Sequence, residues 1–161
     1  MKKNIFGIFR EYIEPKKRLL AETQEKIMSY LKEDYDMTIS YNLSETARPL
    51  LERAIQEGKR FDAILTHIPP ATIPASPQLN DREKHMLAYT KTLEFLKELR
   101  TKASSPLKKQ IPLVAYTAAK PEYEALFRAK GIDAIIYKFH INNWENEAKK
   151  IKETLDFLIV Q

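Results

Sequence analysis

The side chains that could take part in chemistry are few and widely spaced. Glu11, His67, His85 and Thr117 could in principle supply a base and a nucleophile, and His140 stands apart from them. No spacing typical of a catalytic triad or a metal site connects them, because a proline-rich stretch separates His67 from His85. The chain also contains no cysteine, which excludes thiolate zinc sites and cysteine nucleophiles. These residues therefore predict neither an enzyme nor a bound metal or cofactor.

The glycines are too few to form a phosphate-binding loop. A Walker or dinucleotide fingerprint needs several glycines within one turn, so that the backbone can approach the phosphates. The three glycines of this chain, Gly7, Gly58 and Gly131, lie on three different segments. This distribution excludes the commonest classes of nucleotide-dependent enzyme.

The hydrophobic pattern predicts the elements that would position the polar side chains. Five short apolar segments are nearly continuous, which is typical of strands covered on both faces, and segments of helical period separate them. This alternation predicts an α/β fold with a doubly wound, five-stranded parallel sheet of the flavodoxin-like kind, in one domain over residues 1–161. The strands are expected at 4–9, 37–41, 61–66, 111–116 and 132–137, and helices near Pro15, Ser44 or Thr46, Asn80 or Asp81, Lys120 and Asn143.

A proline-rich insertion at residues 68–80 interrupts this regular pattern. It contains four of the nine prolines and follows the third predicted strand. It therefore lies at the carboxyl edge of the sheet, where ligands of doubly wound folds bind. Two interpretations stay open, since a loop of this length is either a functional lid or docking element or a tolerated insertion.

Two segments of the chain resemble response-regulator receiver (CheY-like) domains. The segment IPLVAYTAAKPEYEALFRAKGIDAIIYKF, from Ile111, resembles the fourth strand, fourth helix and fifth strand of that family. The segment FDAILTHIPP, from Phe61, is similar to the third strand, which ends at the phosphoacceptor. In element order the resemblance covers nearly the whole chain. It implies a (βα)5 sandwich and a role in two-component signal transduction.

The resemblance also implies a pocket built from five strand-end positions. In the family, two acidic residues follow the first strand and bind magnesium, and an aspartate after the third strand accepts the phosphoryl group. A hydroxyl and a lysine follow the fourth and fifth strands. The hydroxyl corresponds to Thr117 and the lysine to Lys138, whereas His67 stands at the phosphoacceptor position, and Arg10 and Glu11 occupy the region of the acidic pair.

These departures predict a degenerate receiver pocket, which we call a pseudo-receiver site. Arg10 and His67 replace two of three carboxylates, so the pocket charge changes by about two units against a divalent cation. We therefore expect no magnesium site and no ordinary phosphorelay chemistry. A buried lysine needs a partner, and we expect Lys138 to form an ion pair with Glu11.

The resemblance implies an interaction surface over the fourth helix, fifth strand and fifth helix. In the family an aromatic switch residue precedes the lysine and a proline follows it, and these positions hold Ile135 and Phe139 here. Tyr123, Tyr137 and Trp144 lie on the same predicted surface. Aromatic side chains anchor interfaces where they are exposed, but they serve equally as core packing. The expected partner is a kinase, a regulator or a second copy of the chain in a homodimer.

These observations favour a non-catalytic signalling module that acts through protein–protein interaction independent of phosphorylation. The alternative is a small-anion or nucleotide sensor that uses Arg10 and Lys138; a small α/β enzyme and a genuine phosphorelay receiver have less support. The 27 basic and 22 acidic residues give a net charge of +5. Because this excess is scattered, a nucleic-acid partner is not expected. The chain has no cysteine, no signal peptide and no long apolar run, which predicts a cytoplasmic protein without membrane segments.

Overall fold

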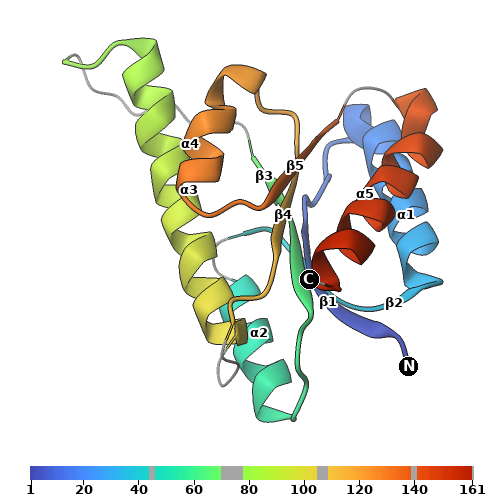
Figure 1. Ribbon diagram of the computed structural model, residues 1–161. Helices are drawn as coiled ribbons and strands as arrows, with labels where there is room; N and C mark the ends of the chain where they lie inside the picture. The colour runs from blue at the N-terminus through green and yellow to red at the C-terminus, as the bar shows by residue number, and fades with distance from the viewer. Residues whose placement is uncertain (44–45, 70–77, 105–108, 139–140, 161) are drawn as a thin grey trace.

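Five parallel strands form one sheet in the order β2-β1-β3-β4-β5 (Figure 1). The computed structural model describes residues 1–43, 46–69, 78–104, 109–138 and 141–160, so most of the proline-rich insertion, residues 70–77, lies outside the described residues. Every neighbouring pair of strands is parallel, and the predicted five-stranded α/β fold is confirmed. The strands are β1 (Lys3–Phe9), β2 (Tyr35–Tyr41), β3 (Ala63–Ile68), β4 (Leu113–Thr117) and β5 (Ala134–Tyr137).

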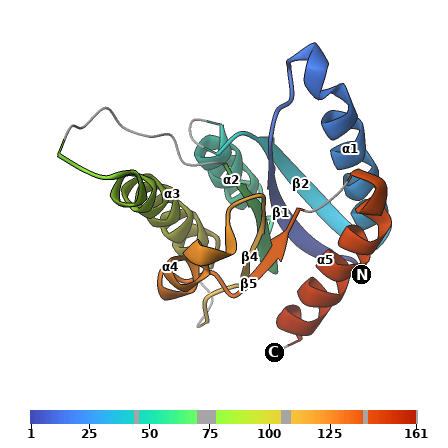
Figure 2. The same ribbon diagram turned by 90° about the horizontal axis from the view of Figure 1, so that it is seen from above.

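Helices cover both faces of the sheet (Figure 2). On one face lie α1 (Arg18–Lys32) and α5 (Trp144–Ile159), which pack against each other and against the sheet. On the other face lie α2 (Ala47–Gln56), α3 (Asp81–Ser104) and α4 (Glu124–Ala129). Single 3₁₀ turns, Pro15–Lys17, Pro121–Tyr123 and Ile141–Asn143, precede α1, α4 and α5. Among the described residues, no helix is long and apolar enough to span a membrane.

Two aspartates explain why β3 and β5 begin two residues later than predicted. The Asp62 carboxylate accepts a hydrogen bond from the Asn4 amide at 2.8 Å, and the Asp62 amide donates to the Asn4 carbonyl. Asp133 makes the same pair of contacts with Leu113. Each aspartate therefore closes the start of a neighbouring strand with its side chain, and the ladder begins after it. At its other end β3 extends to Ile68, two residues beyond the predicted end, so His67 lies within the strand, opposite Tyr116 of β4.

A comparison of two glycines tests the packing between α3 and the turn before β5. Both Gly131 and Gly58 have positive φ, +105° and +90°. A Cβ at Gly131 would lie 2.5 Å from Nη2 of Arg100, whose Nη1 donates to the Gly131 carbonyl at 2.7 Å, whereas a Cβ at Gly58 would meet open space. We expect Gly58→Ala to cost about 1 kcal/mol of unfolding free energy and Gly131→Ala about 2 kcal/mol, measured by urea denaturation. Equal costs would mean that the Arg100 contact contributes nothing.

Candidate functional site

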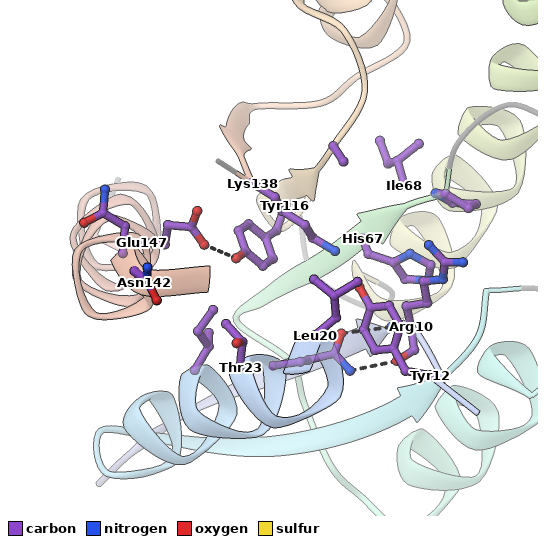
Figure 3. Close-up of a pocket in the computed structure, with 15 residues that line it drawn as sticks. Arg10, Tyr12, Leu20, Thr23, His67, Ile68, Tyr116, Lys138, Asn142 and Glu147 are labelled. Atoms are coloured by element: carbon purple, nitrogen blue, oxygen red, sulfur yellow. Dashed lines mark hydrogen bonds between the residues drawn. The ribbon is translucent and has the colours of Figure 1, made fainter. Parts of the chain in front are cut away.

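A pocket of about 700 Å³ opens at the carboxyl ends of the strands, between the sheet and the first turns of α1 and α5 (Figure 3). Strand ends on one side and helix side chains on the other enclose it. Its lining residues are Arg10, Tyr12, Leu20, Thr23, Gln24, Ile27, His67, Ile68, Pro69, Tyr116, Ala118, Lys138, Asn142, Asn143 and Glu147.

Gln24 of α1 fixes the backbone of Arg10 at the end of β1. The Arg10 amide donates to Oε1 of Gln24 at 3.2 Å, and Nε2 of Gln24 donates to the Arg10 carbonyl at 2.7 Å. Gln24 is buried, and its two hydrogen bonds to the Arg10 backbone satisfy both the oxygen and the nitrogen of its amide. The Arg10 guanidinium lies 5.1 Å from the ring centre of Tyr12. This arrangement directs Arg10 into the pocket.

Glu11 is held outside the pocket. Asn42, which has a φ of +76° just after β2, donates from Nδ2 to the Glu11 carboxylate at 2.9 Å and accepts from the Glu11 amide at 3.4 Å. The predicted ion pair between Glu11 and Lys138 is therefore wrong, because the side-chain amide of Asn42 already binds the carboxylate at the far side of the β1 end.

His67 is a deeply buried polar residue of the pocket. Its side chain reaches the pocket from β3, on the face covered by α1 and α5, and the residue is only 5 % exposed. Its Nε2 has no hydrogen-bond partner among the described residues. Burial, reinforced by the charges of Lys138 and Arg10, lowers the pKa of His67 to about 3. The imidazole is therefore neutral at neutral pH.

Lys138 enters the pocket from the end of β5. Its amide donates to the Thr117 carbonyl at 2.9 Å, and its ammonium lies 4.8 Å from the ring centre of Tyr116. Burial and the Arg10 guanidinium lower the pKa of Lys138 to about 8, and the Glu147 carboxylate acts in the opposite direction. The Tyr116 hydroxyl donates to Glu147, so the ring is fixed beneath the ammonium. Figure 3 shows Lys138 and His67 directed into the same space.

The hydroxyl of Thr117 does not reach the pocket. Thr117 is fully buried, and its Oγ1 donates to the Ile68 carbonyl at 3.1 Å and accepts from the Ala119 amide at 3.0 Å. Its hydrogen bonds are thus made to the backbone. Of the five predicted pocket positions, the structure brings together Arg10, His67 and Lys138 and leaves out Glu11 and Thr117.

The predicted interface residues differ in exposure. Tyr123 is 6 % exposed, packs on Tyr89, and bonds through its hydroxyl to Nδ1 of His85 at 3.0 Å, while Ile135 is also buried. Both therefore act as packing residues in this structure. Tyr137 and Trp144 are half-buried, with part of each side chain accessible, and Phe139 lies outside the described residues.

Sequence reasoning missed the polar residues that build the pocket from the helices. Gln24 and Glu147 occupy buried positions on the apolar faces of α1 and α5. A polar residue within an apolar stripe was the available signal, because such a residue needs a buried partner. Tyr116 was missed as a pocket residue because an aromatic residue in a buried strand is usually core packing.

The residues present do not fit a divalent cation. Magnesium takes oxygen ligands, usually carboxylates, whereas Arg10 and Lys138 carry positive charge into the pocket and Glu147 supplies the one carboxylate among its described lining residues. Among the described residues, no group of three histidine, aspartate or glutamate side chains could hold a metal.

Comparisons with known proteins give a likeness in fold. No protein-family model matches the chain, and no curated protein matches its sequence. The orphan response regulator HP1043 of H. pylori has 13 % identity and a TM-score of 0.51, with 95 % of this chain and 96 % of that chain covered. The phosphorylated cyanobacterial phytochrome response regulator RcpA has 16 % identity and a TM-score of 0.55, with 99 % and 95 % covered. The chain therefore has the fold of these response regulators.

Proposed function

We propose that this chain is a receiver-like signalling module that binds a partner protein without catalysis and without phosphorylation of its own. The observation that carries the proposal is the set of side chains that line the pocket at the carboxyl ends of the strands. Arg10 and Lys138 point into it, and His67 stands where the resemblance places the phosphoacceptor. A pocket of this charge repels the cation that phosphoryl transfer requires.

Hydrogen bonds hold the strand ends around the pocket in one arrangement. Gln24 holds the Arg10 backbone, Asn42 holds Glu11, and Thr117 is bonded to the backbone of β3. A receiver that responds to phosphorylation needs a hydroxyl free to follow the phosphoryl group, and the hydroxyl of Thr117 is already engaged. These contacts support a module that remains in a single state unless a partner or ligand binds.

The partner contact is proposed at the edge formed by β5 and the start of α5. Trp144 begins α5, where the Lys26 ammonium lies 6.0 Å from its ring centre, and part of its side chain remains accessible. Tyr137 of β5 is also half-buried. A partly exposed aromatic side chain of this kind can anchor an interface once a partner desolvates it. The partner is a second protein or a second copy of this chain.

Affinity capture from the native cell tests this function. We expect the tagged wild-type chain to retain the same partner with and without acetyl phosphate and Mg²⁺, and Trp144→Ala to lose that partner at least tenfold. Leu87→Ala, an exposed position on α3 on the other face of the sheet, is the matched control and should retain it. Sedimentation of the purified proteins checks for a homodimer. Capture that depends on acetyl phosphate, or that survives Trp144→Ala unchanged in a folded protein, would contradict the proposal.

A further inference from the structure

The pocket between α1 and α5 has unsatisfied polar groups aimed at its interior. The Nε2 atom of His67 has no hydrogen-bond partner among the described residues, although the residue is 95 % buried. Arg10 and Lys138 converge on the same space, and each acts electrostatically on His67 (Figure 3). A buried polar atom without a partner costs free energy, and two cations held close together repel each other. An anion placed among these three groups would satisfy all of them.

The formal charges of the pocket's described lining residues sum to that of a single cation. Among its lining residues, Arg10 and Lys138 carry positive charge, Glu147 carries negative charge, and His67 is neutral. One unit of positive charge matches a monoanion better than a phosphomonoester or a nucleotide, because Glu147 would repel a second negative charge. A carboxylate also matches the donors in type, since arginine binds its two oxygens in parallel.

Apolar and aromatic side chains form a large part of the remaining wall, beside the polar side chains of Thr23, Gln24, Asn142 and Asn143. Leu20 and Ile27 of α1 line the pocket together with the rings of Tyr12 and Tyr116, and Ile68 lines it at the end of β3. Leu20 is 38 % exposed, so the described residues leave part of this apolar side chain uncovered. A volume of about 700 Å³ suits a small organic molecule rather than a bare ion.

We propose that this pocket binds an organic monoanion, a carboxylate carried on an aromatic or aliphatic body. The carboxylate lies between Arg10 and Lys138 and accepts a hydrogen bond from the His67 tautomer that carries its proton on Nε2, and the body packs against Leu20 and Ile27. This site goes beyond the proposed partner contact, because ligand binding requires neither the surface around Trp144 nor a second protein.

Binding of the carboxylate is coupled to the protonation of Lys138. The anion favours the charged ammonium, so it raises the pKa of Lys138 above its value of about 8 in the free protein. Affinity is therefore greatest below pH 8 and falls as the pH rises through that value. Between pH 8 and the higher pKa of the complex, binding takes up a proton from the buffer.

Calorimetry with three probes that share one aromatic body tests the site. The probes are 2-naphthoate, the neutral 2-naphthalenemethanol and the dianionic 2-naphthyl phosphate. We expect 2-naphthoate to bind with 1:1 stoichiometry and at least tenfold more tightly than either of the others at pH 7. Arg10→Gln and Lys138→Gln should each weaken naphthoate binding at least fivefold, whereas Lys149→Gln, an exposed lysine of α5, should leave it within twofold.

A substitution at the pocket opening guards against variants that fail to fold. Leu20→Ala changes an exposed side chain and should weaken 2-naphthoate and 2-naphthalenemethanol by a similar factor of two to five. Equal affinity of the wild-type chain for those two probes would overturn the carboxylate assignment, and tighter binding of 2-naphthyl phosphate would overturn the choice of a monoanion. Absence of binding by all three probes would overturn the site itself. It would not affect the proposed partner contact at Trp144, which the affinity-capture experiment tests separately.

Discussion

Lowering the pH from 7 to 4.5 should cost the wild-type chain about 2–3 kcal/mol of unfolding free energy that His67→Gln does not lose. The pKa of His67 is about 3 in the folded chain, against 6.5 for an unperturbed histidine. Between these values the unfolded chain binds a proton at His67 and the folded chain does not. The stability contributed by the neutral imidazole is therefore complete above pH 6.5 and is lost progressively as the pH falls toward 3.

Urea unfolding of both proteins at half-unit pH intervals measures this difference. The carboxylates that dominate acid unfolding are the same in both proteins, so their contribution cancels when one curve is subtracted from the other. The absolute stability of His67→Gln does not matter for the test, since only the slope against pH carries the prediction. Parallel curves from pH 7 to 4.5 would show that His67 is solvated rather than enclosed between Arg10 and Lys138.

Raising the pH from 7 to 10 should stabilise the wild-type chain by about 2 kcal/mol relative to Lys138→Met, after allowance for partial screening of the ammonium by solvent. The pKa of Lys138 is about 8 in the folded chain, against 10.5 for an unperturbed lysine. Over this interval the folded chain releases the proton and the unfolded chain keeps it. Stability therefore rises with pH, in the same sense as for His67 but in a different window.

A third variant separates the two causes of this shift. Arg10→Gln keeps the burial of Lys138 but removes the neighbouring charge, so the gain in stability between pH 7 and 10 should shrink without disappearing. Thermal unfolding of the wild-type chain, Lys138→Met and Arg10→Gln gives the comparison. A wild-type curve parallel to that of Lys138→Met would contradict the burial of the ammonium, and an unchanged gain in Arg10→Gln would contradict the proximity of the two cations.

The arrangement of the fold could be predicted from the apolar segments. Runs buried on both faces, such as Ile5 to Phe9, indicate a parallel sheet directly. The strand bounds were less accurate, because they depend on which backbone groups pair between strands. Asp62 and Asp133 use their carboxylates to close strand starts at Asn4 and Leu113. Those contacts join residues far apart in the chain, so the local sequence pattern does not predict them.

The candidate site could be predicted in part. Arg10, His67 and Lys138 each directly follow a predicted strand, and parallel strands bring their carboxyl ends to one edge of the sheet. The partners of these residues could not be predicted in the same way. Asn42, which has a positive φ, donates a side-chain hydrogen bond to the Glu11 carboxylate, and the Tyr116 hydroxyl donates to Glu147, thirty-one residues away in the chain. Side-chain pairing of this kind is decided by packing between elements.

Labelling with acetyl phosphate and Mg²⁺ tests most directly whether this receiver fold works without phosphorylation. The wild-type chain and His67→Asp are incubated with the reagent, and covalent phosphate is measured by intact mass. We expect no phosphate on either protein, because Arg10 stands where the acidic pair should be and Asn42 holds Glu11 away from the pocket. Magnesium-dependent labelling at position 67 in either protein would contradict a pocket organised for cationic side chains instead of a metal ion.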